Sequence, residues 1–283
     1  MTLRHLARGV ALAVAVLGFP AAAAACPFCS SQGQTLSGEV NQADLIVLGT
    51  VKNSKRDPND FTRGTTEIHI DMVIKPHEYL AGKKVLVIPR YVQVDPAAGD
   101  NKYLVFCSVY ANSADLASTA VASALVLGNF ANYQLDAYRG EPAKADSKLP
   151  EYLKGALAVR QKDTPARLRY FFNYLDSPEL IVSSDAYMEF GNAEYKDVRG
   201  VAEKLPADQI FKWLNDRNTA PSRYGLYGLL YGHCGRKEDA PALRKLLDDP
   251  SRAYSSGLDG LLAGYIPARR ATRVNPVLAL RYE

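Results

Sequence analysis

The stretch ADLIVLGTV, residues 43–51, decides how the N-terminal half of the chain is built. Its apolar run is unbroken up to Gly49 and has the length of a strand that lies in a hydrophobic interior. We therefore predict a buried strand here, followed along the chain by further strands.

The segment TTEIHIDMVI, residues 65–74, shows the alternation of a second strand. Alternate residues of a strand project to the same side. One face is mainly apolar and carries Thr66, Ile68, Ile70 and Met72. The other face is polar and carries Glu67, His69 and Asp71.

Two more strands and one helix are predicted before residue 130. Residues 83–94 form the third strand, in which Pro89 marks an edge or a bulge. Residues 102–110 form the fourth, with Cys107 on the face of Tyr103, Val105 and Val109. The alanine-rich segment 113–128 is expected to be helical. Several short strands with one helix favour a small barrel or sandwich.

The first 25 residues have the pattern of a secretory signal peptide. Arg4 and Arg8 precede the short apolar core Val10–Phe19, and a run of alanines follows it. Cleavage after Ala25 places Cys26 first in the mature chain. We therefore expect a protein exported to the periplasm or the extracellular space, with no membrane span in the mature chain; a retained helical anchor is the alternative.

The charge of the chain argues against nucleic acid as a partner. The chain has 34 Lys and Arg against 30 Asp and Glu, but the excess lies in the leader and in the arginine-rich last fifteen residues. The body between them is nearly neutral and lacks the basic surface that phosphates require.

The order of these pieces resembles the netrin-like fold, the OB-type barrel of tissue inhibitors of metalloproteinases. The cysteine pair CPFC (26–29) opens the mature chain, followed by ADLIVLGTV, a long hairpin and YLVFC (103–107). The resemblance covers about residues 26–138. It implies a barrel whose N-terminal cysteines are tied by disulfides to later strands.

The second half of the chain shows a repeating helical pattern. Residues 139–150 are polar and predict a linker. Beyond them we expect three helix pairs, at 169–190, 210–232 and 243–265. Over residues 151–266 the pattern resembles the HEAT repeat family, whose units bury their apolar faces by stacking; an ordinary helical bundle is the alternative.

As a whole, the chain resembles bacterial exported proteins of unassigned function that open with CPFC and end in HEAT-like helices containing YGLYGLLYGHCG (224–235). The resulting expectation is an α+β multidomain protein with an N-terminal OB/netrin-like β-barrel and C-terminal all-α repeats. The last segment, 267–283, loses the helical period and is either an irregular basic tail or the product of a truncated or frameshifted reading frame.

Cys26 and Cys29 are the main candidates for chemistry. A structural disulfide framework with Cys107 is the reading that export favours. A redox pair is the second, although no strand–helix scaffold precedes the motif. A zinc site is the third and needs further ligands, for which the candidates are Cys107, His233 and Cys234. A lipid anchor on Cys26 lacks the leucine of a lipobox.

The polar strand face of Glu67, His69 and Asp71 is a further candidate for a divalent cation, because alternate residues project together. Such a row is more often the solvated face of a strand. We predict no cofactor and no catalytic constellation.

These observations lead to one functional expectation and two alternatives. The expectation is an exported, non-catalytic binding or scaffold protein with a protein or peptide partner. The first alternative, implied by the netrin-like resemblance, is a metalloprotease inhibitor that chelates zinc through Cys26. The second is a thiol oxidoreductase that uses Cys26 and Cys29.

The first prediction is that Cys107 forms a disulfide with Cys26 or Cys29. An N-terminal segment without a core of its own frays unless it is tied down, and the export compartment is oxidising. Mass spectrometry of the mature protein, with and without reductant, measures the pairing. Two free thiols at Cys107 and Cys234 beside a Cys26–Cys29 bridge would contradict it.

Overall fold

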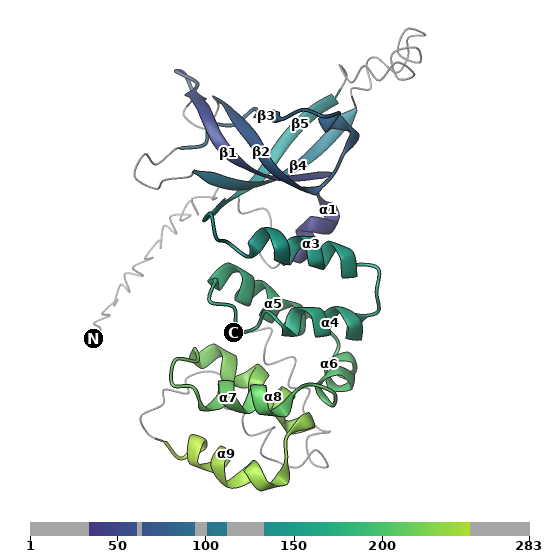
Figure 1. Ribbon diagram of the computed structural model, residues 1–283, viewed down its shortest axis with the longest axis vertical. Coiled ribbons are helices and arrows are strands. Elements are labelled where there is room, and N and C mark those ends of the chain that lie inside the picture. Colours follow the sequence, from purple (N-terminus) through teal and green to yellow (C-terminus); the bar gives the residue numbers. More distant parts are fainter. Residues whose placement is uncertain (1–33, 61–63, 94–100, 112–132, 250–283) are drawn as a thin grey trace, which may run out of the picture. The chain divides into compact units, whose positions relative to one another are not determined.

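One open antiparallel sheet forms the N-terminal half, with the strand order β3-β2-β1-β4-β5. The structure is a computed structural model that describes residues 34–60, 64–93, 101–111 and 133–249 (Figure 1). The strands are β1 (Leu45–Arg56), β2 (Gly64–Lys75), β3 (Val85–Ile88), β4 (Lys102–Ala111) and β5 (Tyr133–Ala143). The predicted leader, the CPFC motif, the helix at 113–128 and the basic tail lie outside the described residues.

The predicted OB/netrin-like barrel is wrong, because β3 and β5 remain the two edges of the sheet. The reason lies in β3, which has only four residues and ends before Pro89, where the backbone has no N–H to continue a ladder. Residues beside β3 contact β5 through side chains. Arg90, which follows β3, binds Asp136 at 3.3 Å, and the Tyr133 hydroxyl donates to the carboxylate of Glu78, which precedes β3.

Strand β1 is the centre of the sheet, and its first part, up to Val51, is buried on both faces, as the unbroken apolar run predicts. One face carries Ile46 and Leu48, which join the core formed with the helices. The other face carries Leu45 and Val47 and lies in a second core. That second core is enclosed by the sheet itself and contains Val51, Ile68, Leu80, Leu86, Ile88, Val105, Cys107, Leu135 and Ala137.

The alternation predicted for β2 holds only in its first half. Thr66 and Ile68 are fully buried, but Met72 is exposed and Ile74 is buried with the helices. The pairing of β1 with β2 shifts register between Ile46 and Val47 and again between Leu48 and Gly49. Such bulges change which residues face which side, and a period of two along one strand does not reveal them.

Along the chain, one helix precedes the long strands and the other helices follow them. The short helix α1 (Leu36–Gln42) precedes β1 and was not predicted. The stretch 139–150, predicted as a linker, holds the end of β5 and the first two residues of α3. The remaining helices are α3 (Leu149–Val159), α4 (Thr164–Phe172), α5 (Leu180–Asn192), α6 (Tyr195–Ala202), α7 (Ala207–Asn215), α8 (Tyr224–Cys234) and α9 (Ala240–Leu247).

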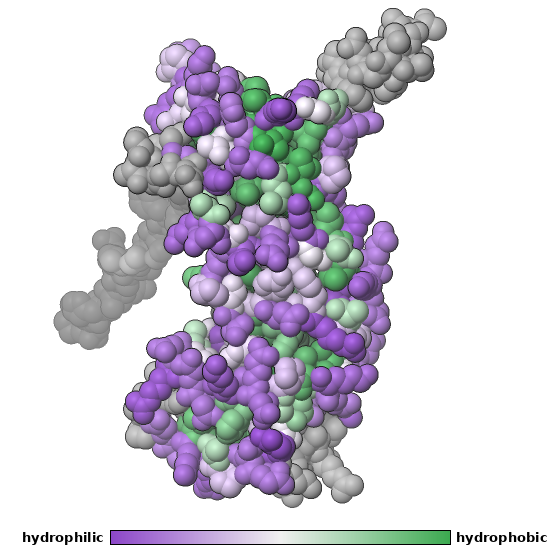
Figure 2. Space-filling view, viewed as in Figure 1, coloured by the Kyte–Doolittle hydropathy of each residue, from purple (hydrophilic) through white to green (hydrophobic). Residues whose placement is uncertain are grey.

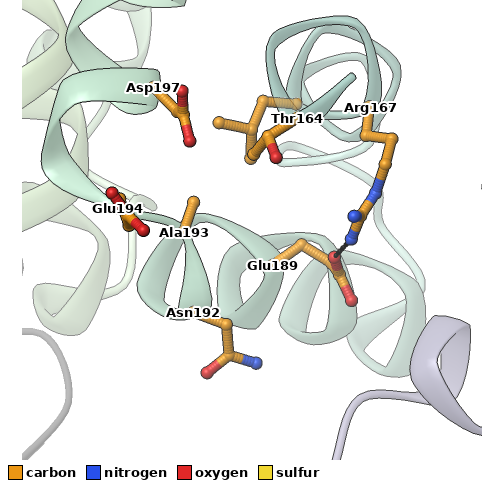
Figure 3. A pocket seen from close by; sticks show the side chains of 8 residues that line it. Thr164, Arg167, Glu189, Asn192, Ala193, Glu194 and Asp197 are labelled. Carbon is orange, nitrogen blue, oxygen red and sulfur yellow. Dashed lines mark hydrogen bonds and ion pairs between the residues drawn. The ribbon is translucent and has the colours of Figure 1, made fainter. Parts of the chain in front are cut away.

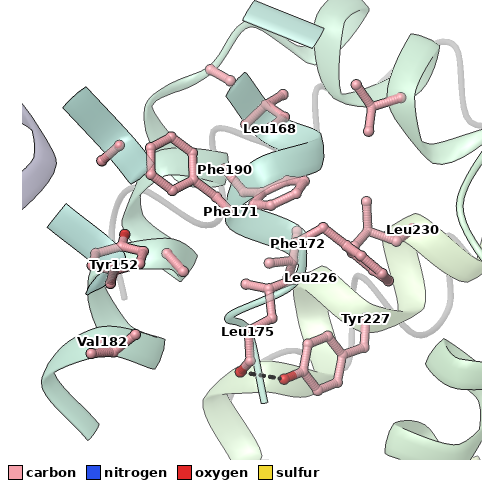
Figure 4. Close-up of a cluster of buried hydrophobic side chains, with 14 of the residues drawn as sticks. Tyr152, Leu168, Phe171, Phe172, Leu175, Val182, Phe190, Leu226, Tyr227 and Leu230 are labelled. Carbon is pink, nitrogen blue, oxygen red and sulfur yellow. Dashed lines mark hydrogen bonds between the residues drawn. The ribbon is translucent and has the colours of Figure 1, made fainter. Parts of the chain in front are cut away.

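Helices α4 and α5 occupy the first predicted helix pair, and α7 and α8 occupy the second. Their apolar faces meet in one core, drawn in Figure 4, in which Tyr227 also donates a hydrogen bond to the Leu175 carbonyl at 3.0 Å. Of the third predicted pair, α9 is described and its partner lies outside the described residues. No helix in the described part of the chain has the length and apolarity of a membrane span.

Three of the large hydrophobic side chains that are exposed lie on strands, namely Met72, Val87 and Tyr110. In the view of Figure 2, hydrophobic residues gather over the part of the molecule where Figure 1 draws the sheet. The other two, Leu180 and Met188, lie on α5.

The second prediction concerns Gly49, where β1 and β2 approach too closely for a side chain. A Cβ atom at Gly49 would lie 2.5 Å from both the His69 carbonyl oxygen and the Ile68 Cγ2 atom. We expect Gly49→Ala to lower the free energy of unfolding by about 2 kcal/mol, because the two strands must move apart. Gly140→Ala in β5 is the matched control, since its Cβ would have no neighbour nearer than 4.0 Å. Urea unfolding measures both, and equal midpoints would contradict the prediction.

Candidate functional site

A buried cluster of polar side chains attaches the start of α1 to α5. Thr35 caps α1 by accepting a hydrogen bond from the Gly38 N–H at 2.9 Å, and its hydroxyl donates to Glu189 Oε1 at 2.6 Å. The Ser37 hydroxyl donates to the same Glu189 oxygen at 2.6 Å. The backbone N–H groups of Leu36 and Ser37 donate to the Asp185 carboxylate.

Asp185 is the most deeply buried carboxylate of this cluster, with 1% of its surface exposed. Besides the two N–H groups of α1, it accepts a hydrogen bond from the hydroxyl of Tyr152 in α3 at 2.7 Å. Burial raises the pKa of Asp185, and the hydrogen bonds it accepts oppose that rise. The free N–H groups at a helix start favour negative charge, which explains why an acid lies here.

The other end of α1 is attached to the sheet. Lys75 of β2 donates to the carbonyls of Val40 and Asn41, each at 3.0 Å. Arg139 of β5 forms an ion pair with the buried Glu39. Seven residues of helix therefore hold the sheet and the helices together through polar contacts at both ends.

Beside this cluster lies a cavity of about 240 Å³ between α4, α5 and α6. Figure 3 shows Arg167 and Glu189 on one side of it and Glu194 and Asp197 on the other. Its walls are formed by Thr164, Arg167, Leu168, Glu189, Asn192, Ala193, Glu194 and Asp197. Most of these wall residues are polar or charged, so the chemistry of the cavity is that of its polar groups.

Local sequence places each wall. Asp163 caps α4 by accepting from the Ala166 N–H at 3.0 Å, and Pro165 fits the first turn, which brings Arg167 one turn into the helix. Ala193 ends α5 in an extended conformation, and the chain turns directly into α6. Asp197 therefore lies in the first turn of α6, where a carboxylate is favourable.

The charges of the cavity do not balance. Arg167 lies 3.3 Å from Glu189 Oε2, and Lys196 binds Glu194 at 2.7 Å from outside the cavity. The hydrogen bond from Lys196 lowers the pKa of Glu194. Three carboxylates thus face two cations, and within the described chain the Asp197 carboxylate has no ion pair of its own. Asp197 interacts with the neighbouring Lys196 through charge, but among the described residues it has no direct ion-pair partner.

The walls include no His, Cys, Lys or Tyr. Their ionisable groups are the Arg167 guanidinium and the carboxylates of Glu189, Glu194 and Asp197. The described residues do not hold three potential metal ligands together. The arrangement can bind a cationic group by charge and hydrogen bonds.

The structure separates the cysteines and the histidine that the sequence analysis combined. Cys26 and Cys29 lie outside the described residues, so their pairing stays a prediction. Cys107 is fully buried in the second core, and burial raises the pKa of its thiol to about 12. Cys234 packs against the helical core, and burial raises its pKa to about 11.

His233, the remaining zinc candidate, faces Tyr195, with 3.1 Å between its Nε2 atom and the tyrosine hydroxyl. Burial lowers the pKa of His233, which favours the neutral imidazole. Cys234 therefore packs against the helical core and His233 contacts Tyr195, which packs against the same core, whereas Cys107 lies in the other one. The structure does not bring these three candidate ligands together.

The polar face of β2, the other candidate cation site, binds neighbouring protein side chains. Glu67 accepts a hydrogen bond from Asn53 at 2.7 Å, and Asp71 binds Thr50 and Lys102. These contacts are those of a solvated strand face rather than of a cation site.

Sequence reasoning missed both the attachment of α1 and the cavity. Asp185 and Glu189 stand four residues apart on α5, beside the apolar Val182, Ala186 and Phe190. Two acids beside an apolar helical face were a signal for buried partners. Thr35 ahead of the apolar Leu36 and Val40, which lie four residues apart, was a signal for a helix start. The cavity had no signal, because its walls come from three helices.

Comparison of the chain with protein-family models, with curated proteins and with solved structures gives no match. The function is therefore argued from these residues alone.

The third prediction concerns pH. The pKa of Asp185 is raised from its ordinary value of 3.8, so just above that value the folded chain keeps a proton that the unfolded chain has lost. The free energy of unfolding of the wild-type chain, minus that of Asp185→Asn, should therefore be largest below this pH. This difference should decrease as the pH rises and should level off above the pKa of Asp185 in the folded state. Urea unfolding of both variants from about pH 3 to about pH 7 measures this; a constant difference would contradict it.

Proposed function

We propose that this protein is a non-catalytic binding protein and that the cavity between α4, α5 and α6 receives a cationic group of its ligand. The observation that carries the proposal is the unbalanced charge of the cavity, in which Asp197 faces inward without an ion pair among the described residues. A cation entering the cavity supplies the missing charge. Binding is the role that charge and hydrogen bonds in the walls support directly.

The dimensions of the cavity support a small group rather than a whole ligand. Its volume lies below the range of about 300–1,000 Å³ that is usual for sites enclosing a drug-sized molecule. One lysine side chain or a small alkylamine fits this size. Leu168 and Ala193 offer apolar contact for its carbon atoms, and Thr164 offers a hydroxyl.

Asp197 also has a structural role, because a carboxylate in the first turn of a helix stabilises that helix. Asp208 also lies in the first turn of its helix, α7, and forms an ion pair with Arg236 at 2.8 Å. It does not line the cavity. The pair of aspartates therefore separates the two roles experimentally.

The two alternatives from the sequence, a metalloprotease inhibitor acting through Cys26 and a thiol oxidoreductase, depend on residues outside the described part. No described contact favours either of them. The raised pKa of Cys107 keeps its thiol protonated at neutral pH, so Cys107 is unsuited to attack a disulfide. Export of the protein belongs to the proposal as well, and it rests on the N-terminal sequence pattern.

The fourth prediction tests the cavity with Nα-acetyl-lysine amide, which carries a single ammonium group. We expect it to bind the full chain, and we expect Asp197→Asn to weaken binding about tenfold or more, as the loss of a charge-assisted contact does. Isothermal titration calorimetry, with nuclear magnetic resonance titration for weak binding, measures the dissociation constants.

Two controls accompany this measurement. The Nα,Nε-diacetylated amide has the same shape without the charge and should not bind. Asp208→Asn should bind as the wild-type chain does. Equal affinity for the charged and the neutral compound would contradict the proposed function.

A further inference from the structure

We infer that Thr35 and Ser37, which do not line the cavity, are positioning residues of the binding site and couple the attachment of α1 to occupation of the cavity. The inference rests on the proposed function. It arises from one side chain, Glu189, which belongs both to the cavity wall and to the cluster that holds α1.

The contacts of Glu189 divide between its two oxygens. Oε1 accepts hydrogen bonds from the hydroxyls of Thr35 and Ser37, each at 2.6 Å. Oε2 faces Arg167 at 3.3 Å, as Figure 3 shows. The two hydroxyls therefore fix the rotation of the carboxylate, and the carboxylate in turn fixes the guanidinium on that side of the cavity.

Burial makes this arrangement sensitive to the hydroxyls. Only 7% of the surface of Glu189 is exposed, so water does not replace donors that are lost. Without Thr35 and Ser37, the carboxylate is left with the single contact to Arg167 and must turn further toward it or toward solvent. Either movement changes the wall opposite Asp197 and the distribution of charge that a cation meets.

The coupling has two states, in which the start of α1 is attached to α5 or released from it. A cation that binds the organised cavity more tightly stabilises the attached state, and attachment of α1 raises the affinity for the cation by the same factor.

The fifth prediction compares the affinity for Nα-acetyl-lysine amide among hydroxyl variants of the full chain, at a temperature where circular dichroism shows each to be folded. We expect Thr35→Ala combined with Ser37→Ala to weaken binding about fivefold. Thr35→Ser combined with Ser37→Thr should restore it, because both hydroxyls return. Ser183→Ala is the matched control, since this buried serine of α5 donates to the Leu180 carbonyl and does not contact Glu189.

A reciprocal measurement uses the wild-type chain and does not depend on the folding of variants. Hydrogen exchange of the α1 amides, including that of Gly38, should slow when the charged compound is added and should not change with the diacetylated one. Unchanged exchange at saturation, or an alanine variant that binds like the wild type, would overturn the coupling while leaving the cavity as the binding site. Failure of the wild-type chain to bind the compound at all would overturn the proposed function, and the coupling with it.

Discussion

Two buried carboxylates, Asp185 and Glu189, impose the constraint on which the described structure depends. A carboxylate away from water is costly unless donors surround it. Asp185 obtains them from two backbone N–H groups at the start of α1 and from Tyr152 in α3, and Glu189 from two hydroxyls and Arg167. The free N–H groups of a helix start need acceptors as much as the acids need donors, so each side satisfies the other. This mutual need selects one place for α1 against the helices.

The sheet is held by the same short helix from the opposite side. Lys75 and Arg139 reach α1 from β2 and β5, while Ile46 and Leu48 of β1 share one core with the helices. The other face of β1 supports a second core inside the curved sheet. A strand buried on both sides needs neighbours that approach closely, which Gly49 permits beside β2.

The cavity is a consequence of how α4, α5 and α6 meet beside this attachment. Glu189 binds the start of α1 through Oε1 and faces Arg167 in the cavity wall through Oε2. The same side chain therefore belongs to both places. The proposed binding site and the attachment of α1 share one residue. In the proposed coupling, a ligand cation adds charge where the cavity has an excess of carboxylates, and its effect extends to α1 through the hydrogen bonds of Glu189.

The sequence by itself determined the central strand, the pairs α4–α5 and α7–α8, and the placement of Cys107 beside Val105 on one strand face. Each of these depends on a pattern of residues within one segment of the chain. The tertiary structure decided that the sheet stays open, that β5 and α3 occupy the expected linker, and that Ile74 rather than Met72 is buried. It also decided the cavity. Arg167, Glu189 and Asp197 are ordinary surface-type residues on three helices, and no local pattern marks them. Only the packing of the helices brings their charges around one cavity, since electrostatic interactions depend on distances in space and not on spacing in the chain.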